Sequence, residues 1–143
     1  MSTATATPEA ATTASSVPRL LTLAMGALLV VDLVGGLWAA LSDVNTWPDA
    51  WGGHALLAAP APMVAAQVLM TWMAVRGRRR RAAIPAGLLA LACVVSVASG
   101  FFDGGLGNAA LEPGMAAYQA FLLAVTGVVG VLAAVRTVQL VRQ

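Results

Sequence analysis

The stretch LLTLAMGALLVVDLVGGLWAAL, residues 20–41, decides the fold. These residues are almost all apolar, and as an α-helix they would be about 33 Å long. The hydrocarbon core of a bilayer is about 30 Å thick, so the segment is long enough to cross it. The apolar region of a cleaved signal peptide has only about 7–15 residues, which favours a retained membrane helix.

Three further apolar segments follow, and the composition of the chain agrees with them. The 143 residues are 59% hydrophobic and only 10% charged, which is too apolar for a soluble domain of this size. Residues 1–18 are mostly Ser, Thr, Ala and Pro, and we expect a disordered cytoplasmic tail there. We predict an all-α fold, an antiparallel four-transmembrane-helix bundle over residues 19–143, with spans at about 20–41, 54–75, 83–102 and 114–135.

The positive charges lie in segments that would share one side of the membrane. All eight are arginines, and five of them lie in the run RGRRRR at residues 76–81. The connections at the opposite ends of the apolar segments, residues 42–53 and 103–113, contain acids but no base. Because Lys and Arg in short loops are retained in the cytoplasm, this asymmetry predicts that both termini are cytoplasmic.

The arginine run, here called the basic loop, consists of Arg76, Arg78, Arg79, Arg80 and Arg81. It can set the topology, clamp anionic lipid headgroups or dock an acidic cytoplasmic protein. Attraction to an anionic lipid surface amounts to about 1 kcal/mol per residue. Since the net charge of +2 follows from this pattern, it does not indicate binding to nucleic acid.

Asp32 is the most informative single residue, because it lies near the centre of the first span. An acid there costs about 2.5–3.5 kcal/mol on insertion scales, so its side chain should face the bundle interior. No span contains a base to pair with it, and burial without a cation favours the neutral acid. We expect hydrogen bonds with Gln67, Ser96 or Thr126. Asp32 is then either a proton-carrying or cation-binding site, or a protonated residue that holds helices together.

Prolines and small residues predict details of the packing. Pro60 and Pro62 each remove a backbone donor, so the second span should kink or restart in its outer third. Gly35 and Gly36 leave room beside Asp32 for another helix or for water. Small faces on three spans predict a tight bundle. Besides Gly35 and Gly36, these faces comprise Ala92, Ser96, Gly100, Ala120, Ala124, Gly127 and Gly130.

His54 is the only histidine and begins the second predicted span. Imidazole is the commonest metal ligand, so His54 could bind haem b or a metal, with Met63, Met115 or a partner subunit as second ligand, or share a metal with Glu112. Alternatively it is an interfacial side chain bonded to a loop, or an external pH sensor.

Short motifs in this chain resemble a family of small, uncharacterised four-span integral membrane proteins of high-GC bacteria. They are Asp32-Leu-Val-Gly-Gly-Leu-Trp38, His54, the arginine-rich turn and Ala109-Ala-Leu-Glu112. The resemblance covers roughly residues 20–135 and implies a multi-pass protein of the bacterial cytoplasmic (inner) membrane. Such relatives often have histidine at the position of Glu112, so a two-histidine site would be incomplete here.

No arrangement of residues predicts catalysis, since paired interior carboxylates, a phosphate-binding loop and a Cys/His cluster are all missing from the sequence. We therefore expect a non-enzymatic membrane protein that acts as an accessory subunit or a homo-oligomer. One alternative is a proton-linked small-molecule transporter that uses Asp32 and Gln67. The other is a b-type haem electron carrier that uses His54.

Overall fold

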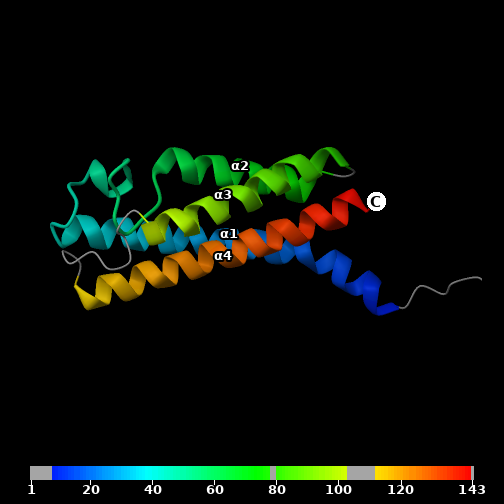
Figure 1. The fold of residues 1–143 in the computed structure, drawn as a ribbon, viewed down its shortest axis with the longest axis horizontal. Helices are drawn as coiled ribbons and strands as arrows, with labels where there is room; N and C mark the ends of the chain where they lie inside the picture. Colours follow the sequence, from blue (N-terminus) through cyan, green and yellow to red (C-terminus); the bar gives the residue numbers. More distant parts are fainter. Residues whose placement is uncertain (1–7, 78–79, 103–111, 143) are drawn as a thin grey trace, which may run out of the picture.

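The computed structural model describes residues 8–77, 80–102 and 112–142, which form a packed bundle of four α-helices (Figure 1). The start of α1 and the end of α4 lie at one end of the bundle, and the connection between α1 and α2 lies at the other. The prediction of an all-α bundle is confirmed. The elements are α1 (Pro8–Leu41), η1 (Asp49–Trp51), α2 (Ala61–Arg76), η2 (Arg80–Ala82), α3 (Ala83–Phe102) and α4 (Pro113–Val141).

Two of the predicted spans match the helices closely. α3 has the predicted bounds, and α4 begins one residue before the predicted start but continues to Val141. α1 ends at Leu41 as predicted but begins at Pro8, so residues 8–18 are helical where the sequence suggests a tail. Pro8 suits the first turn of a helix, and the alanines that follow have the highest helix propensity.

The second predicted span, residues 54–75, needs correction. Residues 54–60 are not helical, and α2 comprises only the 16 residues Ala61–Arg76. Pro60 is the N-cap of α2 and Pro62 lies in its first turn, where a missing N–H breaks no intrahelical bond. The prolines therefore mark the start of the helix, and the predicted kink or restart is wrong because residues 54–60 form no helix that could continue past them.

Three helical segments are long and apolar enough to cross a membrane: Ser16–Leu41, Arg80–Phe102 and Pro113–Val141. α2 would span about 24 Å, which is less than the hydrocarbon thickness of about 30 Å. Large apolar side chains cover the exterior of the bundle, as shown by Phe102 (87% exposed) and Leu23 (62% exposed). A continuous apolar surface of this kind suits lipid and not water.

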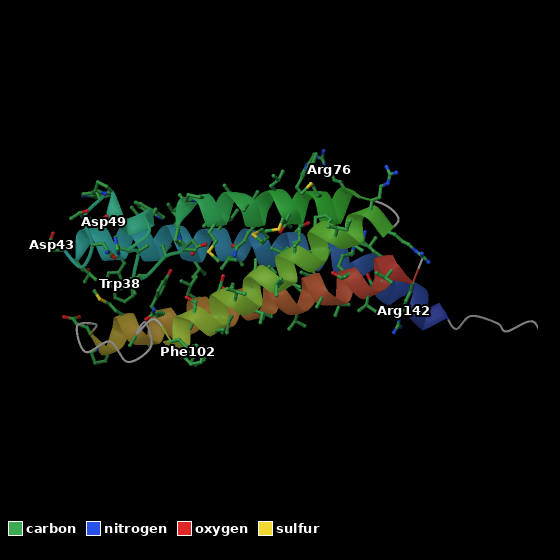
Figure 2. All side chains as sticks on the ribbon, turned by 45° about the horizontal axis from the view of Figure 1, so that its top comes forward. Trp38, Asp43, Asp49, Arg76, Phe102 and Arg142 are labelled. Atoms are coloured by element: carbon green, nitrogen blue, oxygen red, sulfur yellow. The ribbon has the colours of Figure 1, made fainter. Side chains whose placement is uncertain are left out.

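The labelled acidic and basic side chains lie at opposite ends of the bundle (Figure 2). Figure 2 shows Asp43 and Asp49 at the end that holds the α1–α2 connection, and Arg76 and Arg142 at the opposite end. Asp43 has a positive φ of 55°, which Asp tolerates better than most residues, directly after α1 ends. The charge pattern read from the sequence is thus also a separation in space within the described residues.

The helices pack in a ring, in which each helix contacts its two neighbours and α2 barely touches α4. α3 and α4 make the most extensive contact, and they run antiparallel because Gly87 lies near Thr137 whereas Gly100 lies against Leu123. Midway, a Cβ on Gly130 would lie 2.9 Å from the Cβ of Cys93. Gly100 and Gly130 of the predicted small faces therefore serve packing within the chain, whereas Ala120 and Ala124 are exposed and Gly127 is open on the outside of α4.

Candidate functional site

A cavity of about 220 Å³ with apolar and polar lining residues lies between the helices, on the side of the α1–α2 connection. All four helices and residues 55–60 contribute to its wall. Its apolar part comes from residues such as Leu28 and Leu122. Its polar part comes from the side chains of Asp32, Gln67, Ser96, Ser99, Gln119 and Thr126, among which one is an acid and none is a base.

Asp32 is buried in this cavity, with only 3% of its surface exposed. Its Oδ1 accepts a hydrogen bond from the backbone N–H of Ala59 at 3.0 Å. Its Oδ2 is buried and has no hydrogen-bond partner in the described chain. The prediction that Asp32 faces the interior is confirmed, and one of its oxygens remains available to a ligand.

The partner of Asp32 is the backbone N–H of Ala59, which lies in the non-helical segment before α2. Residues 52–60 are not helical, so their N–H groups need acceptors that a helix would have supplied. The Asp32 carboxyl provides one of these acceptors. It also lies close to the N-terminus of α2, where the helix dipole favours negative charge.

Gly35 and Gly36 allow this irregular segment to approach α1. A Cβ on Gly35 would overlap the carbonyl of Leu57, and one on Gly36 would overlap the indole of Trp51. The space that the sequence assigned to a second helix or to water is thus filled by the α1–α2 connection. Asn45 holds the same connection, because its Nδ2 donates to the His54 carbonyl at 3.1 Å and its Oδ1 accepts from the Leu56 N–H at 3.2 Å.

Gln67, which the sequence placed beside Asp32, lines the cavity and is 2% exposed. Ser96 and Thr126, the other suggested partners of Asp32, also line it. Their hydroxyls donate instead to carbonyls one turn back, those of Ala92 and Leu122, each at 2.9 Å. In this structure they make the wall polar without bonding to Asp32.

Gln119 also belongs to the site. It is 8% exposed, lines the cavity and has a buried Oε1 without a hydrogen-bond partner in the described chain. A helical pattern could have found it, because Gln119 and Thr126 lie seven residues apart on one face of α4. Two residues that line the cavity, Asp32 and Gln119, therefore each have a buried oxygen without a hydrogen-bond partner in the described chain, Oδ2 and Oε1.

Tyr118 fixes α4 against α1 beside this site. Its hydroxyl donates to the carbonyl of Val31 at 2.5 Å, one residue before Asp32. Its ring packs edge-on against Trp38, with 5.5 Å between centroids. The partner of the Tyr118 hydroxyl is thus the backbone of α1, one residue from the acid.

His54 lies apart from the cavity. Its side chain is exposed, and Met63 and Met115 do not form a common site with it, because Met63 lines the cavity and Met115 packs with Ala39 and Leu57. Glu112 is the exposed N-cap of α4. In the described part of the chain no three His, Cys, Asp or Glu side chains cluster as a metal site would require. Haem binding by His54 stays a prediction.

The basic loop is described only in part, since Arg78 and Arg79 lie outside the described residues, as does the segment 103–111. Arg80 and Arg81 are exposed in η2. The guanidinium of Arg76 lies 5.2 Å from the centroid of the Trp72 ring, a cation–π contact.

Arg136 differs from the other arginines, because it is buried with 8% exposure. Its Nε donates to the carbonyl of Ala74 at 3.3 Å and its Nη2 to that of Gly77 at 3.5 Å. These carbonyls end α2, where a cation is favourable. The sequence indicated only a topological role for Arg136.

Comparisons with models of known protein families, with curated proteins and with solved structures find no match. The resemblance to four-span proteins of high-GC bacteria therefore gains no support beyond the architecture, a small helical protein with three long apolar helices. Functional inference consequently rests on the cavity around Asp32.

Proposed function

We propose that this chain crosses the inner membrane four times, with both termini in the cytoplasm. α2 would form the second crossing together with residues 52–60. Non-helical backbone is tolerated at membrane depth where protein covers it, and Gly35 packs directly against this segment at Leu57. The arginine-rich end of the bundle would face the cytoplasm, in agreement with the positive-inside rule.

With this topology, we propose that the protein exchanges protons for a small cation across the membrane. The observation that carries the proposal is the buried, unpaired Oδ2 of Asp32, an acid that lines a cavity between the helices. Acids at this depth are costly, and in membrane proteins they commonly mark proton or ion pathways. Non-helical backbone beside the acid also suits transport, because the unwound parts of broken helices line substrate sites near the membrane midplane in many transporters.

The lining chemistry defines the class of ligand. Both unpaired atoms, Asp32 Oδ2 and Gln119 Oε1, are acceptors in this structure, and no base lines the cavity. A complementary ligand therefore brings N–H donors and positive charge. The volume of about 220 Å³ lies below the roughly 300–1,000 Å³ of drug-sized pockets, so the ligand is small. A compact ammonium or guanidinium compound meets these requirements.

Asp32 would bind either a proton or the cation, but not both. Entry of the cation displaces the proton from Oδ2, and departure of the cation allows the proton to return. The N–H of Ala59 continues to bond Oδ1 in both states. Competition for one oxygen therefore couples the two fluxes.

A flux measurement in proteoliposomes tests this proposal. Vesicles containing a pH-sensitive dye, with the membrane potential clamped, receive external guanidinium, which cannot cross as a neutral base. The wild type should alkalinise the interior, because inward guanidinium drives protons out. Asp32→Asn should lose this response, since an amide can accept the Ala59 bond but cannot carry the proton.

Asp43→Asn is the matched control, because it makes the same change at an exposed acid whose backbone conformation Asn also tolerates. It should respond like the wild type. Equal responses from Asp32→Asn and the wild type, or a wild-type response no larger than that of empty vesicles, would contradict proton–cation exchange.

The expected role as an accessory subunit or homo-oligomer stays a prediction. Gly100 and Gly130 pack against Leu123 and Cys93 of the same chain, so these glycines do not supply an external face. The outward small residues of α4, Ala120, Ala124 and Gly127, could still contact a partner, but the cavity gives the transport proposal the more direct support.

A further inference from the structure

A second hollow, of about 390 Å³, lies between α1 and α2 on the side of Arg76. It differs from the Asp32 cavity because its wall is almost entirely apolar. Leu29, Val68, Trp72 and Val75 contribute most of its apolar side chains, and Arg76 lies at one end. Val68 and Arg76 are about 12 Å apart along α2, so the hollow is an elongated groove.

Gly26 makes the groove open. A Cβ placed on Gly26 would have no heavy atom within 4 Å, in contrast to Gly35 and Gly36 on the same helix. α2 therefore does not close against α1 at this level. An occupant from outside the chain can enter here.

The hydroxyl groups that line the groove already donate hydrogen bonds within their own helices. Thr22 donates its hydroxyl to the Pro18 carbonyl at 3.0 Å, and Thr71 donates to the Gln67 carbonyl at 2.8 Å. No acid lines the groove. Among the described lining residues the only charged group is the Arg76 guanidinium, which makes a cation–π contact with Trp72 and can donate hydrogen bonds to an anion.

The occupant must therefore be apolar along its length and anionic at one end. Arg19 lies one turn from Thr22 on the same face of α1, which adds a second positive charge near the Arg76 end. We propose that the groove binds an anionic phospholipid, with an acyl chain along Gly26 and the phosphate at Arg76. This site depends on membrane placement but not on transport by Asp32.

Native mass spectrometry of the delipidated full-length protein tests the site. The protein is titrated with phosphatidylglycerol or with phosphatidylcholine of the same acyl chains. The wild type should retain one phosphatidylglycerol with at least about tenfold higher affinity than phosphatidylcholine, a ratio that corresponds to about 1.4 kcal/mol.

Two variants distinguish the contribution of the lipid acyl chain to binding from that of the headgroup. Gly26→Leu should fill the groove and weaken phosphatidylglycerol binding about tenfold, whereas Gly127→Leu, at an open position on α4, should bind like the wild type. Arg76→Gln should reduce the preference between the two lipids to within about twofold. Unchanged binding by Gly26→Leu, or equal wild-type affinities for the two lipids, would overturn the proposal. Circular dichroism of each variant verifies that the helical fold is retained.

Discussion

At the scale of single residues, Asp32 has a structural role and a proposed chemical role on different oxygens. Oδ1 accepts the Ala59 N–H, while Oδ2 is buried without a partner in the described chain. The sequence predicted burial of Asp32 and the polar neighbour Gln67. It could not predict Ala59 as the partner, because every residue type except proline has a backbone N–H. That of Ala59 is free to bond a side chain because residues 52–60, before α2, are not helical.

Substitutions at Asp32 should separate these roles. Asp32→Asn keeps an acceptor for Ala59, so its free energy of unfolding should stay within about 1 kcal/mol of the wild type. Asp32→Leu leaves a buried N–H unpaired, which should cost about 1–3 kcal/mol. Unfolding in detergent, followed by circular dichroism, measures both. Equal stabilities of the two variants would show that the Ala59 bond does not hold the segment.

Arg136 is the second residue whose role only the structure reveals. Its bonds to Ala74 and Gly77 connect α4 to the end of α2. Arg136→Met should destabilise the protein by about 1.5–3 kcal/mol, because hydrogen bonds from a charged donor are lost. Hydrogen exchange should rise at residues 74–77, whereas the exposed Arg142→Met should leave it unchanged. Equal exchange in both variants would contradict this role.

At the scale of elements, the prolines of α2 could be read from the sequence, but the path of residues 52–60 could not. Pro60 and Pro62 predicted a kink or restart of the helix, whereas α2 begins between them at Ala61 and residues 54–60 form no helix before it. The packing of Leu57 on Gly35 is a contact between distant segments. Glycine at that position indicated open space but did not identify what fills it.

Alanine substitutions of the α1 glycines test this packing. Gly35→Ala should cost about 1–3 kcal/mol, because the added Cβ overlaps the Leu57 backbone. Gly26→Ala adds the same atom in open space and should be neutral or stabilising by up to about 1 kcal/mol. Thermal unfolding compares them, and a Gly35→Ala protein as stable as Gly26→Ala would refute the close approach.

At the scale of the whole molecule, the arrangement of helices follows from apolar length and charge placement. Three helices are long enough to cross the bilayer, and the acidic and basic ends of the bundle are opposite each other. The sequence could predict this arrangement because the length of each apolar segment and the position of each charge can be read directly from the residues. The cavity was harder to foresee, because four helices and a connection contribute to it together.

Reporter fusions test the proposed four crossings. Alkaline phosphatase, which is active only outside the cytoplasm, should be active when fused after Trp47 and inactive when fused after Arg81. A fluorescent protein that folds only in the cytoplasm should give the opposite pattern. If α2 does not cross, both fusion points lie on one side of the membrane and each reporter gives the same result at both.

Counting protons tests the central claim, exchange at Asp32, most directly. Guanidinium is added to purified protein in weakly buffered detergent, and the released protons are measured with a pH indicator. The account predicts release of up to about one proton per bound cation by the wild type and by Asp43→Asn, and none by Asp32→Asn. Cation binding without proton release, or equal release from Asp32→Asn, would contradict it.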